Sequence, residues 1–140
     1  MPMIRQNADS SLGIEGAANG EGGFIPVTLN YIATTVDCTM FTADRPYVVK
    51  AIRGRVDVAG TGGACTATIR KVPSGTALTS GTALHAGSFN LVGTAATQQA
   101  LTLSTTASDL LLAAGDSICY DLTGTATSAV GAISVTLNPA

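Results

Sequence analysis

The chain has 140 residues, which suits one domain that buries about two-thirds of its unfolded surface without needing disulfides or metals. Charged residues make up 11% and aromatic residues 4%, against about 25% charged residues in average domains. Hydrophobic residues reach 46%, yet no apolar run approaches the ~18 residues of a membrane span. The many small residues, Thr and Val therefore favour closely packed β-sheets over amphipathic or membrane helices.

Residues 1–23 form a segment rich in Gly, Asn and Ala ("GIEGAANGEGG") without hydrophobic periodicity. This composition predicts a flexible N-terminal arm that becomes ordered against a neighbour. The first residues hold one Arg and no apolar core, so no secretory signal is expected and synthesis in a cytoplasm follows. The folded domain is predicted to span residues 24–140.

Alternation of apolar and polar residues begins at Phe24. Ile25, Val27, Leu29 and Tyr31 fall on one face of a predicted strand. A second short apolar piece covers residues 39–42 and is followed by the turn-like sequence "ADRP".

The best-defined pattern runs over residues 47–72, "YVVKAIRGRVDVAGTGGACTATIRKV". Two alternating stretches flank residues 60–63 and predict a β-hairpin. In the register that buries the apolar positions, Arg53 pairs with Arg70, and Arg55 lies on the same polar face. Like charges directly opposite each other are unfavourable, so this stripe is expected to splay in solvent or to meet an acidic partner.

The remainder of the chain predicts short strands and no helix longer than two turns. A long connection after residue 72 is expected to hold a turn of helix near Ala77. Further strands are predicted at residues 89–92, 98–105, 110–112, around 118 and 130–137. About eight strands with Gly-rich turns indicate a two-sheet β-sandwich or a barrel. No repeat of fixed period is present, which excludes solenoids and propellers.

Gly115-Asp116-Ser117-Ile118 looks like the start of a GDSL-type esterase, in which the Ser is the nucleophile. Such a Ser needs a histidine within hydrogen-bond reach. The single His85 precedes Ser117, whereas that family places its His near the C-terminus, and the flanking sequence predicts a surface loop for His85. We therefore interpret the motif as a turn that enters a half-buried strand and predict no enzyme activity.

Other site chemistry is sparse. Cys38, Cys65 and Cys119 form no Cys-x-x-Cys motif and are interpreted as reduced, buried thiols, although one disulfide among them remains open. No His-x-His pair or calcium-binding loop occurs, so neither a metal nor a cofactor is expected. The few aromatic residues argue against direct nucleic-acid binding and against stacking on sugars.

Charge is unevenly distributed along the chain. Residues 45–71 hold six basic residues against one acidic residue, whereas the flanking segments are acidic. This segregation indicates electrostatic complementarity with a partner or with a second copy, the alternative being a solvated face.

The segments "YVVKAIRGRVDVAG", "CTATIRKV" and "LLLAAGDSICYDLTG" resemble the cement, or decoration, proteins of tailed-bacteriophage heads, over about residues 24–140. The resemblance is to the jelly-roll type that sits outside a shell of HK97-like major capsid proteins. It implies a jelly-roll fold, the major capsid protein as partner, self-association and stabilisation of the head against internal DNA pressure. It also implies a location on the outer surface of the virion.

The leading hypothesis from the sequence is thus a structural protein that clamps neighbouring capsid subunits and forms a homodimer, with a trimer as second choice. The alternative is a receptor- or glycan-binding β-domain of a phage fibre or similar surface module. A hydrolase using Ser117 is the third. The candidate partner contacts are Arg5, Ile14, Phe24, Arg53, Arg55 and Arg70.

Overall fold

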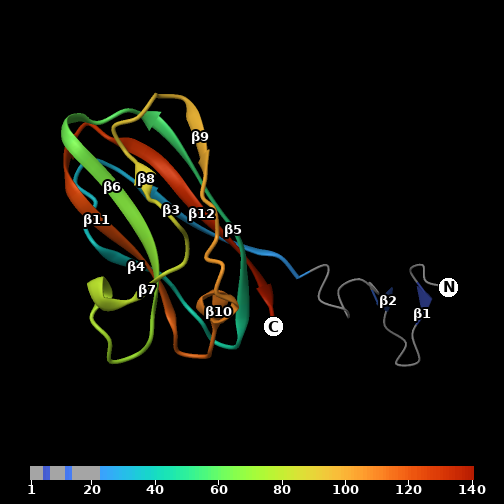
Figure 1. Cartoon of the computed structure of the whole chain (residues 1–140). Coiled ribbons are helices and arrows are strands. Elements are labelled where there is room, and N and C mark those ends of the chain that lie inside the picture. The colour runs from blue at the N-terminus through green and yellow to red at the C-terminus, as the bar shows by residue number, and fades with distance from the viewer. Residues whose placement is uncertain (1–4, 7–11, 14–22) are drawn as a thin grey trace.

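In a computed structural model, residues 5–6, 12–13 and 23–140 are described, and the chain from residue 23 onward forms two antiparallel β-sheets packed face to face (Figure 1). The elements are β1 (Arg5–Gln6), β2 (Leu12–Gly13), β3 (Ile25–Tyr31), β4 (Cys38–Thr42), β5 (Tyr47–Val58), β6 (Thr61–Val72), η1 (Leu78–Ser80), β7 (Thr82–Ala83), β8 (Phe89–Asn90), β9 (Thr97–Ala100), η2 (Ala107–Leu110), β10 (Leu111–Leu112), β11 (Ser117–Thr127) and β12 (Val130–Pro139). Neither described helix, η1 nor η2, has the length or apolarity needed to cross a bilayer.

The strand order is that of a jelly roll. In the first sheet, here called the β5 sheet, β9 and β10 pair with different parts of β5, which is followed by β12 and β3. In the second, the β6 sheet, the order is β4, β11 and β6, and β7 and β8 share the last position. The eight strand positions from β3 onward therefore lie in the orders 1-8-3-6 and 2-7-4-5, a double Greek key. The predicted all-β, two-sheet jelly roll is confirmed.

The predicted hairpin between residues 47–58 and 61–72 is wrong, because β5 and β6 belong to opposite sheets. The chain crosses from one sheet to the other at Gly60, which is buried and donates its N–H to the Leu91 carbonyl at 2.9 Å. A Cβ at Gly60 would lie 2.6 Å from the Ala126 Cβ, so only glycine fits this crossing. Alternation predicts which face of a strand is buried, but it does not identify the partner strand.

The core lies between the sheets and is made by alternating side chains. Val27 and Tyr31 of β3 are buried on the predicted face, and the Tyr31 ring stacks on Tyr120 of β11 with centroids 6.5 Å apart. β11 is buried on both faces from Ile118 to Asp121, whereas the sequence predicted a half-buried strand. As to the cysteines, Cys65 and Cys119 are buried and Cys38 is half-buried, and all three are free thiols.

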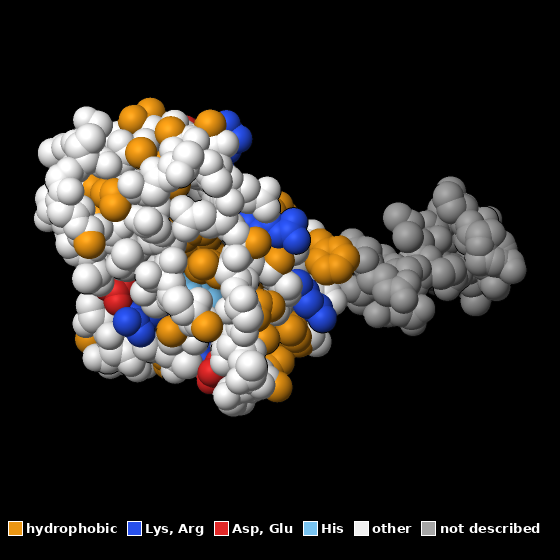
Figure 2. All heavy atoms as spheres, turned by 45° about the horizontal axis from the view of Figure 1, so that its top comes forward, with side chains coloured by type: hydrophobic (Ala, Val, Ile, Leu, Met, Phe, Trp, Pro, Cys, Tyr) orange, Lys and Arg blue, Asp and Glu red, His pale blue; other side chains and the backbone are white. Residues whose placement is uncertain are grey.

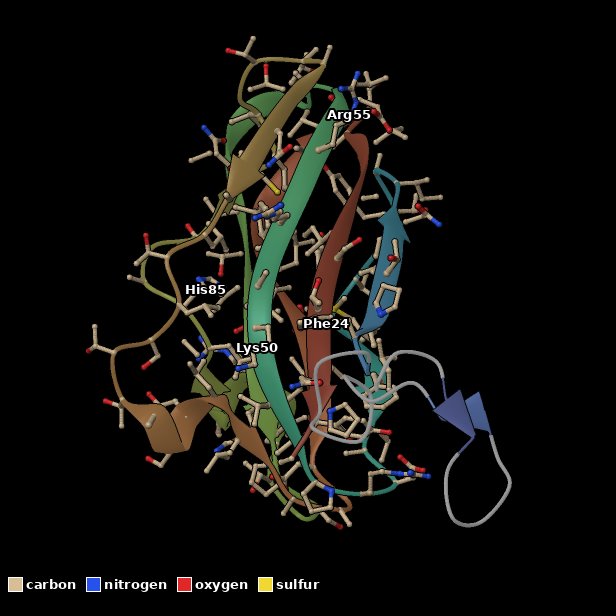
Figure 3. The ribbon with its side chains drawn as sticks, turned by 90° about the vertical axis from the view of Figure 1, so that its right-hand side faces the viewer. Phe24, Lys50, Arg55 and His85 are labelled. Atoms are coloured by element: carbon tan, nitrogen blue, oxygen red, sulfur yellow. The ribbon has the colours of Figure 1, made fainter. Side chains whose placement is uncertain are left out.

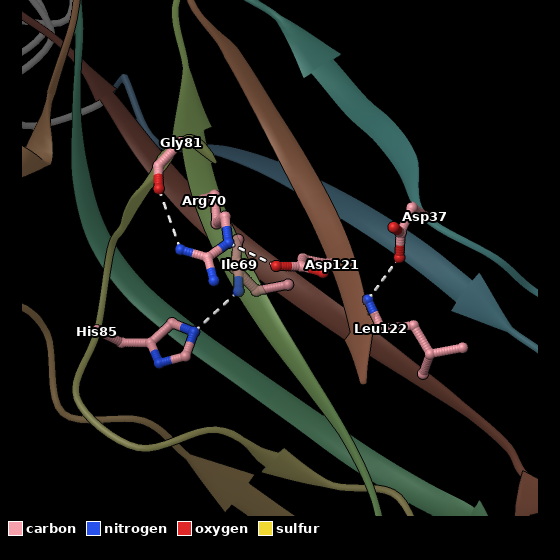
Figure 4. A network of polar contacts seen from close by, with 7 residues as sticks. All are labelled: Asp37, Ile69, Arg70, Gly81, His85, Asp121 and Leu122. Atoms are coloured by element: carbon pink, nitrogen blue, oxygen red, sulfur yellow. Dashed lines mark hydrogen bonds and ion pairs between the residues drawn. The ribbon is translucent and has the colours of Figure 1, made fainter. Parts of the chain in front are cut away.

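His85 is buried, with 5% of its surface exposed, whereas the sequence predicted a surface loop. Its Nε2 accepts a hydrogen bond from the Ile69 N–H at 2.9 Å (Figure 4). Its Nδ1 lies 3.2 Å from the Ala86 carbonyl. These partners fix the tautomer that carries its proton on Nδ1. On one edge of β6, β7 and β8 pair with segments on either side of Ile69. The imidazole accepts the hydrogen bond of the Ile69 N–H that lies between them. Burial lowers the pKa of His85.

Candidate interaction surface

The outward side of the β5 sheet carries the two central residues of the predicted stripe. Ile52 and Val56 point into the core, so the intervening Arg53 and Arg55 point outward, where both are exposed. Arg53 lies opposite Ser134 of β12, which lies opposite Thr28 of β3. Figure 3 views this side of the sheet and labels Phe24, Lys50 and Arg55. We call this surface the docking face and define it by Phe24, Thr28, Asn30, Ile32, Lys50, Arg53, Arg55, Val58, Gln98, Leu111, Val130, Ala132, Ser134 and Thr136.

Exposed hydrophobic residues concentrate on the docking face. Among the described residues, six large hydrophobic side chains are exposed, and five of them lie here: Phe24, Ile32, Val58, Leu111 and Val130. Val58 pairs in register with Val130, and the two make an apolar row across the ends of β5 and β12. Ile32 follows the last paired residue of β3 and also lines a pocket with Tyr120 and Leu122 of β11. Phe24 and Leu111 belong to the other end of the sheet. Exposed apolar residues at both ends of one face favour an interaction site more than residues scattered singly over the surface.

Basic side chains occupy the region between these apolar ends. Lys50, Arg53 and Arg55 are exposed along β5, and Asp57 is the one carboxylate on this strand. The Arg55 Nε donates to Asp57 Oδ1 at 2.8 Å, but both side chains are more than half exposed, so the pair contributes little stability. A hollow of about 230 Å³ lies over the sheet here, lined by Arg53, Gly54, Arg55, Gln98, Ala132 and Ser134. Figure 2 shows Lys and Arg side chains beside hydrophobic ones along the right-hand side of the body.

Arg70 does not belong to this surface, and its assignment to one stripe with Arg53 and Arg55 is wrong. It lies on β6, in the opposite sheet, where its Nε donates to Asp121 Oδ2 at 2.6 Å and its Nη1 to the Gly81 carbonyl at 3.0 Å (Figure 4). The Arg70 side chain is 24% exposed and that of Asp121 is 9% exposed. Arg70 therefore holds the η1 connection and β11 onto β6.

The outward side of the β6 sheet differs in character from the docking face. Its central strands present hydroxyl groups, such as those of Thr66, Thr68 and Thr123. At its edge, Thr42 Oγ1 and Ser117 Oγ are hydrogen-bonded at 2.8 Å. No exposed large hydrophobic residue lies on the described strands of this sheet. The two outer surfaces of the sandwich are thus chemically distinct, and one of them combines cations with exposed apolar groups.

The remaining sequence-predicted contacts precede β3 or lie at its start. Phe24 is 56% exposed. Arg5 is part of β1, with its side chain outside the described residues, and Ile14 also lies outside them. Sequence reasoning missed Ile32 and Val130, because an exposed apolar residue at the end of a strand has the same local pattern as a core residue.

The Ser117 hypothesis finds no base in the structure. The single imidazole of the chain, His85, has its ring nitrogens bonded to Ile69 and Ala86, and the Ser117 hydroxyl pairs with Thr42. In the described part of the chain, no group of three or more His, Cys, Asp or Glu side chains is placed to hold a metal ion. Ser117 begins a strand and bonds to its neighbour.

No protein-family model matches the chain, and no curated protein matches it. Among solved structures, it is similar to a chain of the cyanophage Pam1 capsid asymmetric unit, at 16% identity and a TM-score of 0.48 over 82% of this chain and 81% of that one. It is also similar to a chain of the disulfide-linked pili of Bacillus endospore appendages, at 14% identity and a TM-score of 0.36 over 83% of this chain and 85% of that one. A third similarity is to infectious bursal disease virus, Gx strain, at 17% identity and a TM-score of 0.31, over 79% of this chain but 32% of that one. Two of the three structures are of viruses, and at these values the likenesses concern the fold and assign no function.

Proposed function

We propose that this protein is a structural component of a phage virion, which binds the outside of the head and stabilises contacts between HK97-like major capsid subunits. The observation that carries the proposal is the asymmetry of the sandwich. Five of the six exposed large hydrophobic residues, together with Lys50, Arg53 and Arg55, lie on the docking face. The sequence resemblance to jelly-roll decoration proteins supplies the identity of the partner.

The size of the docking face suits a stable protein interface. β5 has 12 residues, which span about 40 Å, and four strand positions side by side span about 20 Å. The product is about 800 Å², the area that each partner contributes to an interface of standard size.

In this proposal, residues 24–140 form the docking domain and residues 1–23 form an arm that contacts a neighbour. The protein performs no reaction and needs no cofactor. Its copies lie on the outer surface of the head, and repetition over a symmetric lattice raises the effective affinity of each contact.

The test is co-sedimentation of the purified protein with empty heads stripped of accessory proteins. Wild-type protein is expected to bind saturably, at a fixed ratio to the major capsid protein. Arg53→Ser/Arg55→Ser should bind more weakly and with a smaller dependence on salt, because two cations are lost from the interface. Arg45→Ser is the matched control, since Arg45 is 65% exposed in the turn between β4 and β5, outside the docking face.

Val58→Ser/Val130→Ser provides an independent variant for the same co-sedimentation test. It should weaken binding without changing the salt dependence, because the apolar row contributes hydrophobic contact. Absence of saturable binding at any salt concentration would contradict the proposal. Equal binding by wild type and both double variants would remove the docking face from it.

A second candidate is a receptor- or glycan-binding domain of a phage surface structure. The observation in its favour is the hollow on the docking face, whose lining includes Arg53, Arg55, Gln98 and Ser134. Guanidinium groups of this kind bind carboxylates of acidic sugars. Selective binding to acidic glycans, without binding to stripped heads, would favour this candidate.

A further inference from the structure

We infer that the cationic centre of the docking face, Lys50, Arg53 and Arg55, binds the acidic N-terminal arm of a second copy of this chain. The inference deepens the proposed function, on which it rests for the arrangement of copies side by side. On the head, the basic centre then joins neighbouring copies and the apolar row contacts the shell, so the loss of Arg53 and Arg55 weakens head binding through the contacts between copies.

The arm carries the complementary charge. Between residues 6 and 23 the sequence has Asp9, Glu15 and Glu21 and no Lys or Arg. Three carboxylates of the arm thus correspond in number to the three cations of the docking face. Opposite charges spread over two surfaces in this way guide association and fix its register.

The spacing of the charges also matches. Asp9, Glu15 and Glu21 are six residues apart, which is about 20 Å in an extended chain. Lys50 and Arg55 lie five residues apart on β5, which is about 17 Å. Glu15 and Glu21, which both follow β2, can therefore reach both ends of the basic row if the chain between them is extended. The shallow hollow between Arg53 and Arg55, with its small lining residues, leaves room for the backbone of that segment.

The described part of the arm indicates an external partner. β1 and β2 form a two-stranded ribbon, with Arg5 opposite Gly13 and Gln6 opposite Leu12, and neither strand pairs with a described strand of the sandwich. A two-stranded ribbon is marginally stable by itself and is stabilised by packing on another surface. The arm joins the sandwich at the edge strand β3, and 23 residues reach at most about 80 Å, well beyond the ~20 Å width of one sheet.

The test exchanges the charges between two variants and uses purified protein without heads. The first variant, Asp9→Lys/Glu15→Lys/Glu21→Lys, has a basic arm and the native docking face. The second, Arg53→Glu/Arg55→Glu, has the native arm and an acidic docking face. Arg53 and Arg55 are exposed, and circular dichroism with urea unfolding verifies that each variant folds.

Sedimentation velocity at low salt then measures self-association. Wild-type protein should associate, and each variant alone should associate about tenfold more weakly, since several exposed ion pairs are replaced by repulsion. An equimolar mixture of the two variants should form a heterodimer, because each arm then meets a face of opposite charge. An arm bound to the face of its own chain would leave the wild-type protein monomeric.

Three results would overturn the inference: a wild-type protein that stays monomeric, variants that associate as well as wild type, or a mixture that forms no heterodimer. Head binding is measured separately by co-sedimentation. A failed charge exchange with intact head binding would therefore reject the arm as partner and leave the proposed function in place.

Discussion

Replacing Arg70 should destabilise the protein far more than replacing Arg53, although both residues lie on long strands of similar pattern. Arg70→Ser leaves the Asp121 carboxylate, 9% exposed, without the guanidinium that now lies 2.6 Å from it, and also removes the 3.0 Å bond to the Gly81 carbonyl. Breaking a fully buried pair costs about 3–5 kcal/mol. Because the Arg70 side chain is 24% exposed, water reaches the pair, and we expect about 3 kcal/mol.

For a domain of 140 residues, that loss corresponds to a decrease in Tm of about 10 °C. Arg53→Ser, on an exposed position, should change the free energy of unfolding by less than about 0.5 kcal/mol. Urea unfolding followed by tyrosine fluorescence measures both, since the chain has 0 Trp and 3 Tyr.

A matched control separates the lost charge from lost packing. Arg70→Ser/Asp121→Asn should be more stable than Arg70→Ser alone, because no uncompensated carboxylate remains in the protein. Equal urea midpoints for Arg70→Ser and Arg53→Ser would refute the reasoning. The reasoning would also be refuted if the double variant lost as much stability as the sum of the losses from Arg70→Ser and Asp121→Asn measured separately.

Three further predictions concern His85, Gly131 and Ser117. Burial holds the pKa of His85 below its usual 6.5, so the unfolded chain binds the proton more readily than the folded protein. The free energy of unfolding should therefore be highest above pH 6.5 and decrease by up to about 1.4 kcal/mol per pH unit below it. Urea unfolding from pH 7.5 to pH 5 should show this slope. His85→Gln, which retains an acceptor for the Ile69 N–H, should reduce it, and an unchanged slope would show that His85 does not cause the pH dependence. Gly131→Ala places a Cβ against the Arg55 carbonyl and should cost about 3 kcal/mol in the same unfolding assay, whereas a wild-type midpoint would show that β12 shifts freely. Fluorophosphonate should label wild type no faster than Ser117→Ala, and selective labelling of Ser117 would restore the esterase hypothesis.

The strands and their buried faces were predictable because the two-residue period of a strand is a local property. The segment over residues 25–31 shows this well, with Val27 and Tyr31 buried as its alternation predicts. The pairing of strands was not predictable in the same way. Residues 47–58 and 61–72 satisfy the pattern of a hairpin, yet the chain crosses between the sheets at Gly60, and β6 finds its partner β11 about fifty residues later.

The same limit applies to the interaction surface. Exposure of Arg53 and Arg55 follows from their place in the alternation of β5. Arg70 follows the same alternation, but its environment depends on Asp121, which lies 51 residues away in sequence. The apolar row was not predictable, because exposure of Val130 depends on where the neighbouring strands end.

The claim that this protein binds a phage head through its docking face is tested most directly by amine labelling on saturated heads. The chain has two lysines: Lys50 on the docking face, and Lys71 on β6, whose Nζ donates to the Ser108 and Leu111 carbonyls at 2.7 and 3.1 Å. Lys50 of the bound protein should be acetylated at least about tenfold more slowly than Lys50 of dilute free protein, because the interface excludes reagent from the docking face. Lys71, which donates to the carbonyl of Leu111 at the edge of that face, should be slowed less. Equal Lys50 rates in bound and free protein would contradict the account.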